Sequence, residues 1–172
     1  FACQDPDVAG SDPYICMGRL STNISCPTEI QREWIVENTT QARALAGSIR
    51  CYGGSFEVTW KCRVTIDETI SIFDGTSVSV TSNEVNATIA GDGQICLFKV
   101  VNASLHLRDI TLSRGYNNYG GAIAASDSRL SFHRVNFSDN TASIGGGAVF
   151  LSRGTVVSFD GETSFLNNTA LD

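Results

Sequence analysis

Two stretches of the chain, Leu105-His-Leu-Arg-Asp-Ile-Thr-Leu112 and Leu130-Ser-Phe-His-Arg-Val-Asn-Phe137, carry the same apolar pattern 25 residues apart. Within each stretch, apolar and polar residues alternate over short runs, which is the period of a β-strand and not of a helix. One irregular step in each stretch indicates a bend. A pattern that returns at a nearly fixed interval is typical of a solenoid, in which each turn of the chain stacks on the one before. The sequence therefore predicts an all-β fold of short, stacked parallel strands around one continuous core.

Two shorter motifs repeat in the same region with a similar spacing. Phe137-Ser-Asp-Asn140 returns as Phe165-Leu-Asn-Asn168 after 28 residues, and Gly120-Gly-Ala-Ile123 returns as Gly146-Gly-Ala-Val149 after 26. We expect the two asparagines to stack at one corner, where their amides hydrogen-bond the turn backbone. Other corners need positive φ or a close backbone approach, and there we expect the glycines Gly120, Gly121, Gly145, Gly146 and Gly147.

A different pattern precedes the repeats. The Ala-rich run 39–49 follows Asn38, a good N-cap residue, and predicts a short helix that covers the N-terminal end of the stack. Residues 1–37 are expected to be irregular chain held by disulfides around this cap. Both tryptophans, Trp34 and Trp60, are interpreted as packing residues of the cap and core.

Looser alternation between residues 64 and 100 predicts about two earlier turns of the stack. The chain is thus divided into a disulfide-rich N-terminal segment with its cap helix, residues 1–63, and a parallel β-helix, residues 64–172.

The paired motifs around Gly120 and Gly146 resemble the GGA(I/V) and FxxN repeats of chlamydial polymorphic outer-membrane proteins, and the pattern is similar to that of many surface proteins in the pectin-lyase-like superfamily. The resemblance covers about residues 39–170. It implies a right-handed parallel β-helix with an N-terminal cap helix, and for repeat-rich members it implies adhesion or surface structure. Glycosylation motifs depart from a bacterial origin, so we expect a eukaryotic secreted relative.

Composition excludes several classes of function. The chain has 172 residues, 42% of them apolar, and a net charge of −6 with only two lysines, Lys61 and Lys99. Nucleic-acid binding is not expected, because phosphate neutralisation needs clustered cations. No apolar run approaches the roughly 20 residues that span a bilayer. We expect no cofactor, because no Gly-rich phosphate loop carries the required Lys-Ser/Thr.

Cysteines and glycosylation motifs point to an oxidising, extracellular setting. The even number of cysteines predicts disulfides among all six, with the pairing left open: Cys3, Cys16, Cys26, Cys51, Cys62 and Cys96. Asn-x-Ser/Thr motifs predict N-glycosylation at Asn23, Asn38, Asn86, Asn102, Asn136 and Asn167. The chain begins with Phe1, so we expect a processed product or a fragment from which any signal peptide has gone. The expected location is extracellular, either secreted or at the cell surface.

Superposing the repeats stacks Arg108 over His133, with Asp160 near the next turn, and brings Asp109 over Arg134. These outward residues could form a short charged column, and Arg108, His133 and Asp160 are the catalytic candidates for polysaccharide chemistry. The simpler interpretation is a solvated face with ion pairs between turns. Neither the Asp-Gly steps nor the cysteines and histidines have metal-site spacing, so no metal site is expected.

Three functions fit these observations. The first is a non-catalytic extracellular structural protein. Only two residues follow the last repeat, so either the chain continues or its open edge pairs head-to-tail with another copy and builds a filament or coat. The second is a polysaccharide lyase, hydrolase or epimerase. The third is a carbohydrate-binding adhesin, with Tyr116 and Tyr119 of a corner loop stacking on sugar rings, and extracellular polysaccharide is then the partner.

Overall fold

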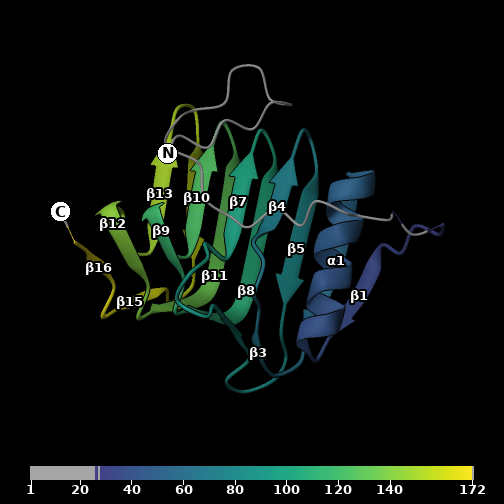
Figure 1. Ribbon diagram of the computed structural model, residues 1–172, viewed down its shortest axis with the longest axis horizontal. Helices are drawn as coiled ribbons and strands as arrows, with labels where there is room; N and C mark the ends of the chain where they lie inside the picture. The colour runs from purple at the N-terminus through teal and green to yellow at the C-terminus, as the bar shows by residue number, and fades with distance from the viewer. Residues whose placement is uncertain (1–25, 27, 172) are drawn as a thin grey trace.

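The computed structural model describes residue 26 and residues 28–171 (Figure 1). This part of the chain is predominantly β, with three parallel sheets and the helix α1 (Thr39–Tyr52). The largest sheet has nine strands: β1 Glu33–Val36, β2 Ser55–Trp60, β3 Arg63–Thr65, β5 Ser77–Thr81, β6 Thr88–Ala90, β8 Ser104–Ser113, β11 Arg129–Ser138, β14 Val156–Asp160 and β15 Ser164–Leu166.

Two smaller sheets complete the fold. The four-stranded sheet has the order β13 (Val149–Ser152), β10 (Ile123–Ser126), β7 (Phe98–Val101) and β4 (Ile70–Phe73). The three-stranded sheet has the order β16 (Thr169–Ala170), β12 (Thr141–Gly145) and β9 (Tyr116–Tyr119). Along the chain, β7, β8 and β9 place one strand in each sheet, and β10, β11 and β12 repeat this course one step further along every sheet.

Neighbouring strands pair in parallel, and the register confirms the stacking predicted from the repeats. Leu105, Leu130 and Val157 are direct partners across β8, β11 and β14. All four apolar positions of the quoted stretches coincide, since Leu107, Ile110 and Leu112 likewise pair with their counterparts on β11. The arrangement is compatible with a β-helix-like solenoid, and its inward side chains form one continuous buried cluster from Val36 to Ala148.

The irregular step inside each repeat is a sharp bend in the strand. Asp109 in β8 and Arg134 in β11 have positive φ values of 56° and 51°. Because this left-handed conformation interrupts the pleat, the two halves of each strand face the core from different directions. The bend predicted from the break in alternation is therefore confirmed.

Most corner glycines behave as predicted. Gly120 and Gly146 have positive φ. A Cβ atom on Gly121 would lie 2.4 Å from the Gly147 carbonyl oxygen, so the stacked turns approach each other too closely for a side chain. Gly145 differs, because it lies within β12 with neither a positive φ nor a close backbone neighbour.

The stacked asparagines hydrogen-bond each other and the turns, as predicted. Asn140 is fully buried; its Nδ2 donates to the Leu112 carbonyl at 3.0 Å and to Asn168 Oδ1 at 2.9 Å, and its Oδ1 accepts from the Gly115 amide at 2.9 Å. Asn168 Nδ2 donates in turn to the Phe137 carbonyl. These bonds satisfy a polar side chain that is otherwise costly to bury.

Helix α1 begins where the sequence predicts and ends three residues later than expected. Asn38 is its N-cap, with Oδ1 accepting from the Gln41 amide at 3.0 Å, and Gly53 ends it with a φ of 53°. Leu45, Ala46 and Ile49 are buried, and the helix packs against β4 and β1. Figure 1 shows α1 and β1 at one end of the stack and β13 and β16 at the other.

The N-terminal segment contains more sheet than expected. Residues 33–36, predicted to be irregular, form β1, which pairs in parallel with β2. A four-residue strand is too short to show clear alternation, and its pairing with β2 determines its conformation. Trp60 is fully buried and Trp34 packs partly buried against the core, which confirms their packing roles.

We predict that Phe137→Ala destabilises the protein far more than Phe165→Ala. The two rings stack with centroids 4.7 Å apart, yet Phe137 is 0% exposed and Phe165 52% exposed. Emptying the buried position should lower the free energy of unfolding by about 3–5 kcal/mol, and emptying the exposed one by much less. Urea unfolding at low protein concentration measures both. Equal losses would contradict the stacked arrangement.

Candidate functional site

The charged column predicted from the repeats exists on the outer face of the nine-stranded sheet. His133 pairs in register with Arg108 on β8 and with Asp160 on β14, so the three candidate residues lie on successive strands. One position further along, Arg134 of β11 reaches Asp109 of β8, as predicted. The sequence thus identified which charged residues are neighbours.

These charges are largely occupied with each other. Arg134 donates two hydrogen bonds to Asp109, Nε to Oδ1 at 2.5 Å and NH2 to Oδ2 at 2.8 Å. Hydrogen bonding from Arg134 lowers the pKa of the Asp109 carboxyl and raises that of the guanidinium. His133 Nδ1 lies 3.1 Å from Asp160 Oδ2. Because one partner of each pair, Arg134 or Asp160, is exposed, solvent screens both pairs and they add little to stability.

Acid–base or nucleophilic chemistry needs a carboxylate or imidazole aimed at a substrate site. Here Asp109 accepts a bidentate arginine and Asp160 contacts the histidine of the same column. Among the described residues, no group of three or more His, Cys, Asp or Glu side chains could hold a metal ion.

The glycosylation motifs that the structure describes all have exposed asparagines: Asn38, Asn86, Asn102, Asn136 and Asn167. Asn23 lies outside the described residues. Asn38 uses Oδ1 for capping the helix, and a glycan on Nδ2 would leave that acceptor in place.

Two of these asparagines border the charged column. Thr88, Thr111 and Asn136 are in register, so Asn86, Asp109 and Arg134, each two residues earlier, occupy equivalent bends. All three have positive φ. Glycans on Asn86 and Asn136 would therefore project from the bent face that carries the Asp109–Arg134 pair.

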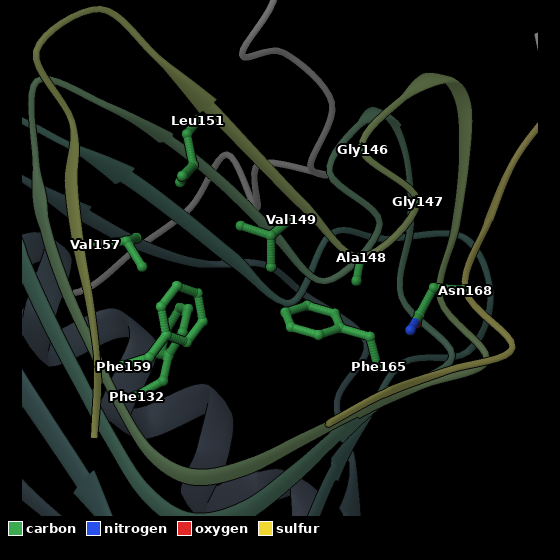
Figure 2. Close-up of a pocket in the computed structure, with 10 residues that line it drawn as sticks. All are labelled: Phe132, Gly146, Gly147, Ala148, Val149, Leu151, Val157, Phe159, Phe165 and Asn168. Atoms are coloured by element: carbon green, nitrogen blue, oxygen red, sulfur yellow. The ribbon is translucent and has the colours of Figure 1, made fainter. Parts of the chain in front are cut away.

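The C-terminal end of the stack exposes its interior. Phe132 is 0% exposed, whereas its partner Phe159 in the last turn is 58% exposed, and Leu151 is 43% exposed above the fully buried Ala125. An open apolar pocket of about 290 Å³ is lined by residues that include Phe132, Val149, Leu151, Val157, Phe159 and Phe165 (Figure 2). Within the described residues, the strands β13, β14, β15 and β16 each pair on one side only.

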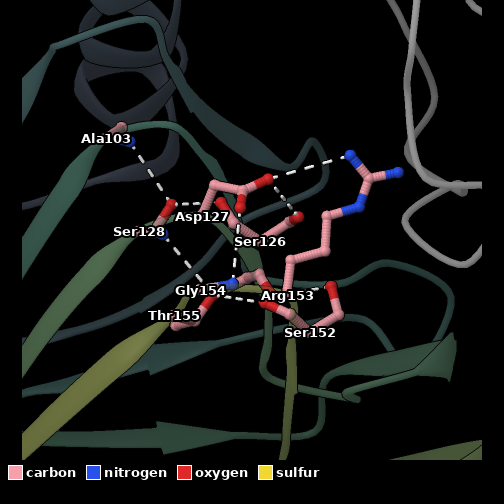
Figure 3. Close-up of polar contacts among 9 residues, drawn as sticks. Ala103, Ser126, Asp127, Ser128, Ser152, Arg153, Gly154 and Thr155 are labelled. Carbon is pink, nitrogen blue, oxygen red and sulfur yellow. Dashed lines mark hydrogen bonds and ion pairs between the residues drawn. The ribbon is translucent and has the colours of Figure 1, made fainter.

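The corner beside this open end is held by polar contacts (Figure 3). Asp127 lies 3.8 Å from Arg153 NH1 and accepts from the Gly154 amide at 3.4 Å. Ser128 Oγ donates to the Ser126 carbonyl at 2.6 Å. Arg153 is thus anchored to the preceding turn of the chain.

Cysteine pairing differs from the sequence expectation. Cys26 and Cys51 form a disulfide, which ties the chain before β1 to the last turn of α1. Cys62 and Cys96 are free in the structure, and Cys3 and Cys16 lie outside the described residues. Cys96 is buried at a corner, where its thiol donates to the Phe98 carbonyl at 3.1 Å, and burial raises its pKa to about 12. This buried thiol acts as a small core residue, because no reactive thiolate forms at neutral pH.

The tyrosines proposed for sugar stacking lie in a strand, β9, and not in a corner loop. The ring of Tyr119 contacts Phe150 of the last turn, with centroids 4.7 Å apart, and both tyrosines are only partly exposed. Strand β9 therefore does not expose two adjacent aromatic rings on which a sugar could stack.

No protein-family model matches the chain, and no solved structure matches it. A 55-residue stretch is 40% identical to metabotropic glutamate receptor-like protein P of Dictyostelium discoideum, which covers 28% of this chain and 4% of that protein. The chain thus spans a small fraction of the relative's length. Within the described residues, no helix is both long and apolar enough to cross a bilayer.

Proposed function

We propose that this chain is a non-catalytic, N-glycosylated extracellular structural protein with a right-handed parallel β-helix of the pectin-lyase-like type. Copies associate through the open C-terminal end of the stack and contribute to a filament or cell-surface coat. The observation that carries the proposal is the exposure of the inward side chains Leu151, Phe159 and Phe165, whose partners one turn earlier are buried.

An open stack end combines two unfavourable features in water. Its apolar side chains lack the cover that each preceding turn receives from the next. Its edge strands also leave backbone donors and acceptors ready to pair with another strand. Association through β-strand addition removes both, because added strands complete the hydrogen bonding and cover the apolar interior.

Exposed sequons and a disulfide support the extracellular assignment. The Cys26–Cys51 bond is of a kind that persists in oxidising compartments. Asn167 is the described sequon residue in the last turn, and its Nδ2 donates to Asp139 Oδ1, on the preceding turn, at 3.3 Å. The side chain therefore points back along the stack, so a glycan there would leave the open end accessible while the other glycans cover the sides.

A polysaccharide-active enzyme or a carbohydrate-binding adhesin is the alternative on the same fold. The alignment of Arg108, His133 and Asp160 on one outer face favours it. It ranks second because His133 and Asp160 contact each other and because predicted glycans on Asn86 and Asn136 flank the column.

We predict that Phe159→Asp abolishes self-association. A carboxylate in the apolar end would have to be desolvated when a second molecule covers it. Light scattering over a range of protein concentrations measures the change in mass, and thermal unfolding checks the fold. Val85→Asp is the matched control, because Val85 is 88% exposed and lies between β5 and β6, several turns away from the open end. A wild-type protein that stays monomeric at the highest concentration contradicts the proposal.

Secretion from eukaryotic cells should yield a protein whose mass falls on treatment with a peptide N-glycosidase. Asn136→Gln should remove the mass of one glycan, because the acceptor amide is lost. Asn83→Gln, at an exposed asparagine outside any sequon, should leave the glycan mass unchanged. Intact-mass spectrometry gives the result, and an unmodified secreted protein would remove this part of the proposal.

On a panel of uronate polymers we expect no turnover, followed as new reducing ends and as the ultraviolet absorbance of unsaturated ends. The enzyme interpretation replaces ours if the wild type turns over a polymer, His133→Ala loses this activity and Ser131→Ala keeps it. Ser131 is a suitable control because it lies two residues earlier on β11 and shares the outward face.

A further inference from the structure

The two ends of the stack are not equivalent. At the N-terminal end, α1 packs against β4, the edge strand of the four-stranded sheet, with Leu45 and Ile49 buried. At the C-terminal end, the edge strands β13, β14, β15 and β16 have no such cover in the described chain. The head-to-tail contact expected from the sequence would place β13 of one copy against the β4 edge of the next, which the helix already occupies.

An open end can instead be covered by the same end of a second copy. Such a contact is isologous, so that each surface element meets its counterpart in the partner across a two-fold axis. Edge strands related in this way run antiparallel, a pairing at least as stable per residue as the parallel one inside the stack. The inward side chains Val157 and Phe159 of β14 would then meet their counterparts.

Charges around β14 match this arrangement. Arg153 lies three residues before the strand, whereas Asp160 ends it and Glu162 follows two residues later. Arg153 is held at the corner by Asp127, with its side chain half exposed, and the side chain of Asp160 is 80% exposed. One end of the edge strand is therefore basic and the other acidic, so an antiparallel copy brings opposite charges together at both ends.

Resting on the association proposed above, we propose that two copies of this chain join through their C-terminal ends into a discrete two-fold dimer, which would be a unit of a coat and not of a head-to-tail filament. In this dimer, β14 pairs antiparallel with β14 of the second copy. The apolar pocket lined by Phe159 and Phe165 closes against its counterpart, and Arg153 of each copy faces Asp160 and Glu162 of the other. Glycans remain on the sides, and the helix-covered ends face outward.

A charge-exchange experiment tests the arrangement. Arg153→Glu and the double variant Asp160→Lys with Glu162→Lys, each prepared separately as the full glycosylated chain, should each weaken dimerisation by about tenfold or more, because both contacts across the axis become repulsive. An equimolar mixture should dimerise like the wild type, because a mixed pair has opposite charges at both contacts. Arg129→Glu, the same charge change on the preceding turn, is the control and should have little effect.

Analytical ultracentrifugation measures dimer formation in the mixture, in which one of the two variants carries a fluorescent label. A wild type that stops at the dimer, weakened by each variant and restored by mixing, supports the two-fold arrangement. Open-ended growth, or variants that weaken association without rescue on mixing, overturns it while leaving association through the open end intact. If copies do not associate through the open end at all, the result is different, because Phe159→Asp then leaves the mass measured by light scattering unchanged.

Discussion

The structure depends on in-register parallel pairing between successive turns of the chain. Once β8, β11 and β14 pair residue for residue, every side chain lies directly above its counterpart one turn away. Apolar positions then build one continuous core, Asn140 and Asn168 build a hydrogen-bonded ladder, and charged positions build an outer column. A one-residue slip would reverse inward and outward faces, so the alternation in the sequence enforces the register.

Regions with strong repetition could be predicted from the sequence nearly residue by residue. The pairing of Leu105 with Leu130, the contact between Asn140 and Asn168 and the approach of Arg134 to Asp109 all follow from superposing repeats. The N-cap Asn38 could be found because capping is a local interaction. These predictions concern either equivalent positions in successive repeats or neighbours close in the chain.

Features that arise from long-range packing could not be predicted in this way. Strand β1 is too short to show a pattern and exists because β2 provides its pairing edge. The free thiol of Cys96 follows from its burial beside backbone carbonyls, which a count of cysteines does not reveal. The conformation of the tyrosine segment is set by its pairing with β12, so a Tyr- and Asn-rich stretch that suggests a loop forms β9. Ion pairs between turns were expected as the simpler interpretation of the charged column, but the contact of His133 with Asp160 depends on side-chain geometry.

The disulfide between Cys26 and Cys51 makes one end of the stack more resistant to unfolding than the other. It fastens the chain before β1 to the end of α1, so the helix-covered end is cross-linked as well as packed. In a stack whose turns contact mainly their neighbours, loss of order spreads most easily from the least supported turn. Under tension or heating, the molecule should therefore unfold turn by turn, starting at the last turn, which contains Phe165, and ending at the turn that the disulfide cross-links.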